Sequence, residues 1–238
     1  MLTKLSWRGS LSFAIFLNEV LPLKEKTRDL RALASEIYGK EKMTFHERLT
    51  SVYRPLYAPF EHLIRWVPPQ ARLIDIGCGT GCFMLLADRR VGLGASFGFD
   101  TNERSIRIAS RSNRNPEMSF QVGTNPSKEL LRQAQVVSLI DVIHHIPAFE
   151  RFQVLDAVIN EMPAGARLLV KDLDSYPRWK AWANQITDYL STRSKVSYLG
   201  INELESHLRS KGLRILTSER LDKHIWSHYL VVAEKLSS

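Results

Sequence analysis

A glycine-rich segment at residues 77–81 constrains the fold of this chain more than any other feature. It reads Gly-Cys-Gly-Thr-Gly and lies between an apolar run at residues 72–76 and an apolar helical pattern that begins after Gly81. Glycines permit positive φ and let a ligand approach the backbone, and a helix N-terminus offers unpaired N–H groups and a partial positive charge. The order of buried strand, glycine turn and helix therefore predicts a binding site for a nucleotide-like ligand.

The rest of the chain after Pro68 and Pro69 repeats this alternation of strand and helix. Short apolar runs separated by helical patterns are typical of a parallel sheet with crossover helices. The pattern predicts an α/β fold with seven strands, mostly parallel, that ends in an antiparallel hairpin. The predicted strands cover residues 72–76, 95–99, 118–122, 136–140, 167–171, 213–220 and 227–234, and a helix is expected at residues 202–211 before the hairpin.

Two helical regions are expected outside this alternation. Apolar residues at spacings of three and four predict helices from residue 2 to about residue 66, so residues 1–68 are interpreted as a helical extension or lid and residues 69–238 as the main domain. A further helix at residues 177–192, within an inserted segment at 173–200, carries Trp179, Trp182 and Tyr189 at helical spacing. These aromatic side chains are expected either to pack in the core or to roof an apolar or aromatic acceptor, in which case the segment and the N-terminal helices would form a lid that excludes water.

The residue types around the glycines distinguish between two ligands. A dinucleotide fingerprint needs a third glycine at the position that Cys82 occupies, because the turn must wrap a pyrophosphate. A methionine moiety needs no such cradle, but its amino group needs an acceptor, which Asp75 or nearby carbonyls can supply. The spacing therefore favours S-adenosylmethionine over a nicotinamide cofactor.

Residues 73–81 resemble the first motif of the class I S-adenosylmethionine-dependent methyltransferases, in the form D-x-G-C-G-x-G, and residues 98–100 resemble the next motif. The resemblance implies a Rossmann-like fold and a role for Asp100, with Thr101 beside it, in binding both ribose hydroxyls. A carboxylate suits this role because it accepts two hydrogen bonds. The cofactor-binding residues implied by the first motif are Asp75, Gly77, Cys78, Gly79 and Gly81.

The chain departs from the family after the third predicted strand. The family usually has a Gly-Asp pair there, whose acid accepts the adenine amino group, whereas this sequence has Gly123 and Thr124. Thr124 or Asn125 can accept that hydrogen bond instead. Gly123 and Thr124 are therefore kept as candidate cofactor residues.

The catalytic candidates follow the fourth and fifth predicted strands. Residues 141–147 resemble the family segment beneath the methionine and sulfonium part of the cofactor, which implies a cofactor-binding role for Asp141. Methyl transfer from a sulfonium needs chiefly alignment, and a hydroxyl acceptor gains from a general base. His144 and His145 are candidates for this base, since the pKa of histidine lies near neutrality. The resemblance equally allows a histidine here that only packs or hydrogen-bonds against the neighbouring loop. Adjacent histidines usually point apart, so a metal site is not expected.

Residues 171–180 resemble, more loosely, a subset of these enzymes associated with polyketide and lipid-like biosynthesis, as does the Arg54-Pro55 pair. Asp172, Tyr176 and Lys171 are expected to bind or deprotonate an acceptor, or to form a helix N-cap or a solvated turn. The predicted function is O- or C-methylation of a phenolic, quinone-like or acyl acceptor, as a small molecule or on a carrier protein.

The charge and the cysteine content limit which partners and which cellular compartment are expected. Lys and Arg outnumber Asp and Glu by 33 to 25, and the resulting charge of +8 suits an acidic carrier protein or peripheral contact with an anionic membrane. The charges are spread without long runs, so RNA methylation is kept only as an alternative, beside a cofactor-binding scaffold without turnover. The two cysteines, Cys78 and Cys82, lie in one short segment and favour a reducing cytoplasm, and the apolar stretch 11–17 is too short to span a bilayer.

Overall fold

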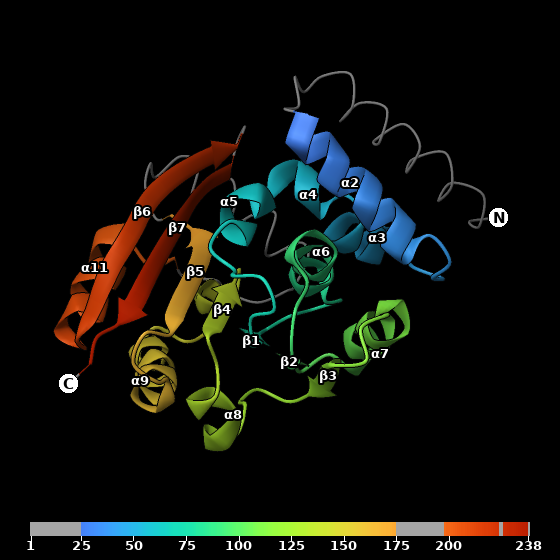
Figure 1. The fold of residues 1–238 in the computed structure, drawn as a ribbon. Coiled ribbons are helices and arrows are strands. Elements are labelled where there is room, and N and C mark those ends of the chain that lie inside the picture. Colours follow the sequence, from blue (N-terminus) through green and yellow to red (C-terminus); the bar gives the residue numbers. More distant parts are fainter. Residues whose placement is uncertain (1–24, 175–197, 224–225, 238) are drawn as a thin grey trace.

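The computed structural model describes residues 25–174, 198–223 and 226–237 of the chain, and a single mixed sheet organises the fold within these ranges (Figure 1). The strand order is β3-β2-β1-β4-β5-β7-β6. The strands are β1 (Leu73–Ile76), β2 (Ser96–Asp100), β3 (Met118–Val122), β4 (Val136–Ile140), β5 (Arg167–Leu173), β6 (Leu213–Lys223) and β7 (Trp226–Lys235).

The strand pairing confirms the predicted sheet. Strands β1 to β5 pair in parallel, β7 runs antiparallel to both β5 and β6, and β6 has an irregularity between Ile215 and Thr217. All seven predicted strands are present. Strand β5 continues past its predicted end at residue 171 because β7 pairs with it as far as Leu173, opposite His228.

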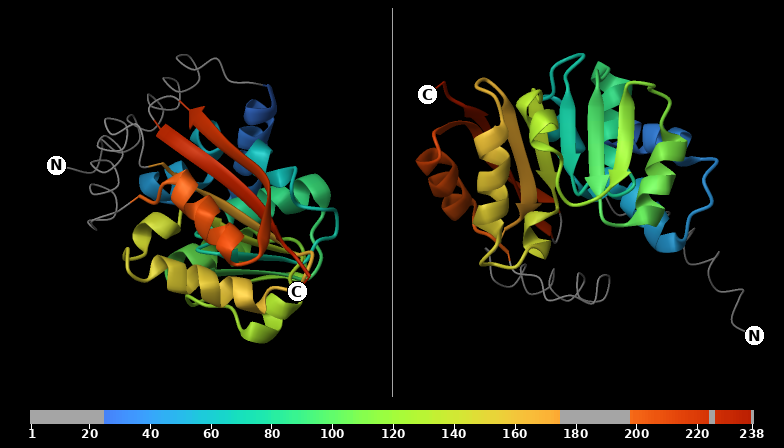
Figure 2. Two further views of the ribbon diagram at one scale, coloured as in Figure 1. Left: turned by 90° about the vertical axis from the view of Figure 1, so that its left-hand side faces the viewer. Right: turned by 90° about the horizontal axis from the view of Figure 1, so that it is seen from below.

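Helices cover both faces of the sheet (Figures 1 and 2). One hydrophobic cluster joins the first face to the N-terminal helices, α6 and α7, and a second joins the other face to α8, α9 and α11. The helix predicted at residues 202–211 is α11, shifted by one residue. The described helices are α2 (Glu25–Tyr38), α3 (Phe45–Ser51), α4 (Arg54–Tyr57), α5 (Phe60–Ile64), α6 (Cys82–Val91), α7 (Glu103–Ser112), α8 (Lys128–Arg132), the 3-10 turn η1 (Ile143–His145), α9 (Arg151–Glu161) and α11 (Ile201–Ser210).

The N-terminal helices pack into the main core. Leu30 and Ala34 of α2 and Phe60 of α5 belong to the same buried cluster as Leu73 of β1 and Phe83 of α6. Burial of apolar surface stabilises the fold by about 25 cal/mol for each Å² removed from water. The helical prediction for this region is therefore confirmed from residue 25 onward, and the region belongs to the globular core.

The parallel strands place their following loops along one edge of the sheet. Strand β1 lies between β2 and β4, so the chain crosses over in opposite directions on either side of it. In open α/β sheets the crevice at such a switch point, beyond the carboxyl ends of the strands, is where ligands bind. No helix in the described ranges is long and apolar enough to cross a membrane.

Candidate active site

The glycine loop after β1 is shaped by its own backbone amides. The N–H groups of Gly77 and Cys78 both donate to the carbonyl of Phe99, at 2.8 and 2.9 Å, and the N–H of Gly79 donates to Oδ2 of Asp100 at 2.8 Å. These amides hold the loop against β2. Because these three amides donate within the protein, the parts of the loop that can contact a ligand are its carbonyls and its open side.

Gly77 and Gly79 face different surroundings, although both have positive φ, at 74° and 56°. A Cβ built on Gly77 would lie 2.4 Å from Cγ2 of Val142, whereas a Cβ built on Gly79 would meet no atom within 4 Å. The loop thus packs tightly at Gly77 and leaves open space at Gly79. That open space beside a backbone turn fits the close approach of a ligand.

The N-terminal helices hold the same loop from the other side. The hydroxyl of Tyr38 on α2 donates to the carbonyl of Thr80 at 2.8 Å, and Ser51 on α3 shares a hydrogen bond of 2.7 Å with the Thr80 hydroxyl. On α3, Glu47 is paired with Arg104 of α7, and this contact lowers the pKa of Glu47 to about 2. Helix α3 therefore bridges the glycine loop and α7.

The carboxylate of Asp100 lies at the end of β2, beside the glycine loop. Its two oxygens accept from the N–H groups of Gly79 and Asn102, both at 2.8 Å. The N–H of Gly123 donates to the Asp100 carbonyl at 3.0 Å, which places the exposed side chain of Thr124 near this edge. The structure brings together the predicted residues Asp100, Thr101, Gly123 and Thr124 at the ends of β2 and β3.

Asp75 is buried in the centre of the sheet. Its carboxyl accepts a hydrogen bond of 2.6 Å from the hydroxyl of Ser138 on β4. Burial raises its pKa to about 7, although the Ser138 hydrogen bond opposes this rise. A cation close to this carboxyl would lower its pKa again and favour the carboxylate form.

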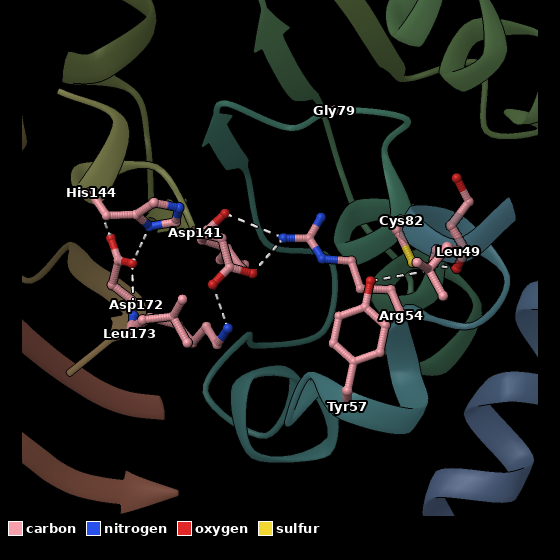
Figure 3. A network of polar contacts seen from close by, with 12 residues as sticks. Leu49, Arg54, Tyr57, Gly79, Cys82, Asp141, His144, Asp172 and Leu173 are labelled. Carbon is pink, nitrogen blue, oxygen red and sulfur yellow. Dashed lines mark hydrogen bonds and ion pairs between the residues drawn. The ribbon is translucent and has the colours of Figure 1, made fainter. Parts of the chain in front are cut away.

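Asp141, directly after β4, sits between two cations (Figure 3). Its φ of 59° lies in the left-handed region, one carboxylate oxygen is 2.7 Å from Nη2 of Arg54, and the other is in contact with Nζ of Lys171. Burial alone would raise its pKa, but Lys171 and Arg54 hold the pKa of Asp141 well below its usual range. Asp141 is therefore an anion that ties β5 and α4 to the end of β4.

His144 and Asp172 form a buried pair across the ends of β4 and β5 (Figure 3). Nδ1 of His144 contacts Oδ1 of Asp172, and the His144 N–H donates to Oδ2 at 3.1 Å. The exposed fractions of the two side chains are 4% and 2%. Asp172 is thus neither a helix N-cap nor a solvated turn residue; it orients His144.

The ring of His145 is exposed and lies beside that of His144, with centroids 4.0 Å apart. The expectation that the two histidines point apart is wrong, because the 3-10 turn η1 places them on one side. Among the described residues, no group of three or more His, Cys, Asp or Glu side chains is arranged to hold a metal ion.

Comparison with known families decides the identity of this site. A family model described as a methyltransferase domain matches residues 44–218. The chain belongs to this methyltransferase family. Its methyl donor is S-adenosylmethionine, so the predicted enzyme class and cofactor are confirmed.

Solved structures of two methyltransferases and one cyclase have folds similar to that of this chain. The magnesium protoporphyrin IX methyltransferase from Synechocystis PCC 6803 with bound SAH has 15% identity and a TM-score of 0.61, covering 86% of this chain and 93% of that chain. An S-adenosylmethionine-dependent methyltransferase from Archaeoglobus fulgidus has 16% identity and a TM-score of 0.59, covering 80% and 98%. The [4+2]-cyclase SpnF has 13% identity and a TM-score of 0.60, covering 78% and 83%. No curated protein matches the chain.

The structure of this methyltransferase adds two residues that the sequence did not assign to the site. Both come from the N-terminal helices: Tyr38 reaches the loop after β1, and Arg54 reaches the loop after β4. The Arg54-Pro55 pair was the only signal for this region. Tyr176 and the predicted inserted helix lie outside the described residues.

Proposed function

We propose that this methyltransferase acts on an acceptor whose nucleophile must lose a proton, foremost the hydroxyl of a phenolic or quinone-like compound. The observation that carries the proposal is the buried pair of His144 and Asp172 at the ends of β4 and β5. A carboxylate can only accept, so it favours the tautomer of His144 with the proton on Nδ1. Nε2 is then the basic nitrogen.

The proposed chemistry needs one proton transfer and one displacement. When bound, S-adenosylmethionine supplies a methyl group on a sulfonium, which leaves as a neutral thioether. Nε2 of His144 would take the proton of the acceptor hydroxyl, so that the oxygen lone pair could form the bond to the methyl carbon while the carbon–sulfur bond breaks. Asp172 keeps the ring oriented and stabilises the imidazolium that forms. An enolisable carbon of an acyl acceptor would use the same base.

We propose the following roles for the cofactor residues. Asp75 and the carbonyls of the glycine loop receive the ammonium group, Asp100 receives the ribose hydroxyls, and Thr124 lies near the adenine. This assignment is supported by two hydrogen bonds that hold these residues together. The N–H of Gly79 donates to the Asp100 carboxylate, and the N–H of Gly123 donates to the Asp100 carbonyl. The division into a lid at residues 1–68 and a main domain at residues 69–238 is likewise a proposal. It is supported by α3 lying over the glycine loop.

The test separates catalysis from cofactor binding. His144→Ala is expected to lower kcat with a panel of phenols by about 10² to 10⁴-fold, while the Kd for S-adenosylhomocysteine stays unchanged. His145→Ala is the matched comparison, because its ring lies beside that of His144 but is exposed. Asp172→Asn should move the lower limb of the pH profile of kcat to lower pH, because the imidazolium loses its anionic partner. If neither histidine variant slows turnover, base catalysis from this segment is wrong.

The charge of the chain supports a second, finer proposal about the acceptor. A formal charge of +8 would attract an acidic carrier protein that presents the acceptor. In that case kcat/KM for a carrier-bound acceptor should fall steeply as salt rises, whereas kcat/KM for the free acceptor should not. Equal salt dependence of the two would argue for a free small molecule.

A further inference from the structure

We propose that a cavity lined by α2 and α4 binds an organic anion, one that carries a carboxylate or phosphate group on an apolar body. The two helices pack against each other in the N-terminal region (Figure 1). The proposal goes beyond methyl transfer, because it gives the N-terminal region a ligand of its own.

The size and lining of the cavity fit an amphiphilic ligand. Its volume is about 450 Å³, and among the described residues it is lined by Arg28, Arg31 and Ala32 of α2 and by Leu56 of α4. Pockets for small organic ligands measure about 300 to 1,000 Å³. Two of the lining side chains are cationic and two are apolar. This combination suits an acidic group attached to an apolar body better than a hydrated inorganic ion.

The side chain of Arg31 is held in place but lacks an acceptor for one of its donors. Its Cζ lies 5.3 Å from the centroid of the Tyr53 ring, a distance at which the ring attracts the guanidinium. Its Nε is fully buried and has no hydrogen-bond partner among the described residues. A buried donor without an acceptor destabilises the fold. An anion in the cavity that Arg31 lines would supply the acceptor, through a charge-assisted hydrogen bond.

The second cation of the cavity lies on the same side of α2. Arg28 precedes Arg31 by three residues, a spacing that places both side chains on one face of a helix. Within the described part of the chain neither arginine forms an ion pair, whereas Asp29, on another face of α2, lies 4.0 Å from Arg90 of α6. Two cations without a carboxylate partner therefore line one cavity, which makes it complementary to an anion.

The cavity lies on a different side of α4 from the methyl-transfer site. Nη2 of Arg54 is 2.7 Å from the carboxylate of Asp141, whereas Leu56, two residues later on α4, lines the cavity. Side chains two residues apart on a helix point roughly 200° away from each other. An anion in the cavity would therefore contact the helix that carries Arg54 without occupying the site at Asp141.

The experiment measures binding of two probes by calorimetry: octanoate, and octanamide, which has the same chain without the charge. We expect the wild-type protein to bind octanoate about tenfold or more tightly, with or without S-adenosylhomocysteine. In Arg31→Met this preference should disappear. Arg111→Met is the matched control, since it removes an exposed arginine of α7 and should keep the preference.

Two further probes identify the acidic group and the need for an apolar body. Octyl phosphate binding more tightly than octanoate, with the same loss in Arg31→Met, would support a phosphate ligand, and the reverse order would support a carboxylate. Inorganic phosphate should bind much more weakly than either. If inorganic phosphate binds as tightly as octyl phosphate, the apolar part of the proposal is wrong.

The remaining outcomes contradict the anion site itself. Equal binding of octanoate and octanamide to the wild-type protein would mean that the arginines do not engage an anion. An equal loss of preference in Arg111→Met would show a general effect of charge, and competition between octanoate and S-adenosylhomocysteine would place the anion in the cofactor site. If Arg31→Met does not fold by circular dichroism, Arg28→Met, which changes an exposed side chain, must show the loss of preference.

Discussion

The hydroxyl of Ser138 on β4 donates a hydrogen bond of 2.6 Å to the carboxyl of Asp75 on the neighbouring strand β1. The acid that receives this hydrogen bond lies buried at the centre of the sheet, where burial raises its pKa to about 7. A buried acid of this kind binds its proton more tightly in the folded than in the unfolded chain. Its ionisation therefore couples folding to pH.

We predict that Asp75→Asn removes a loss of stability between about pH 4 and pH 7. The folded pKa of Asp75 is raised to about 7 from 3.8, so the native state holds the proton in this window and the unfolded state does not. Stability should fall as pH rises, by about 1.4 kcal/mol per unit at most. Urea unfolding of the apo-protein at pH 5 and pH 8 measures it: the stability of Asp75→Asn relative to wild type should increase toward pH 8. An equal difference at both pH values would contradict the prediction.

A second prediction concerns the carboxylate at the end of β2. Asp100→Ala should weaken binding of S-adenosylhomocysteine by about 2 kcal/mol or more, because it removes the proposed acceptor of two ribose hydroxyls. Asp100→Asn keeps one acceptor oxygen for the N–H of Gly79 or Asn102 and should lose less. Calorimetry measures both. An unchanged dissociation constant in Asp100→Ala would place the ribose elsewhere.

The two loop glycines give a third prediction, because they separate stability from binding. Gly77→Ala should destabilise the fold by roughly several kcal/mol, since its Cβ would lie 2.4 Å from Val142. Gly79→Ala meets no atom within 4 Å and should cost only about 1–2 kcal/mol of backbone strain, yet weaken cofactor binding. Thermal unfolding and calorimetry together separate these effects. Normal cofactor affinity in Gly79→Ala would mean that the open side of the loop does not face the ligand.

The sequence predicted those features of the fold and site that depend on local pattern. Short apolar runs between turns predicted all seven strands, and the glycine spacing predicted the loop after β1. The pairing of β5 with β7 as far as Leu173 was not predicted. It places residues 171 and 172 within the strand, which explains their different contacts. Because side chains alternate along a strand, Lys171 points toward Asp141 and Asp172 toward His144.

The contact of Arg54 with Asp141 was beyond sequence reasoning for a different reason. It joins residues 87 positions apart, between a four-residue helix and a loop. Neither periodicity nor motif spacing predicts which side chain of a short helix contacts the edge of a sheet. Arg54 reaches Asp141 because α4, which carries it, packs against α2, while α2 and α5 pack onto α6.

The last prediction uses two tyrosines that are equally buried but differ in their hydroxyl contacts. Tyr38 donates to the carbonyl of Thr80 at 2.8 Å, whereas the buried Tyr229 hydroxyl has no hydrogen-bond partner among the residues that the structure describes. Removing a satisfied buried hydroxyl strands its acceptor, whereas removing an unsatisfied one relieves a desolvation cost of about 1–3 kcal/mol. Tyr229→Phe should therefore be neutral or stabilising in urea unfolding, and Tyr38→Phe should be destabilising by about 1 kcal/mol or more. A marked loss of stability in Tyr229→Phe would show that its hydroxyl has a partner in the folded protein and would contradict the prediction.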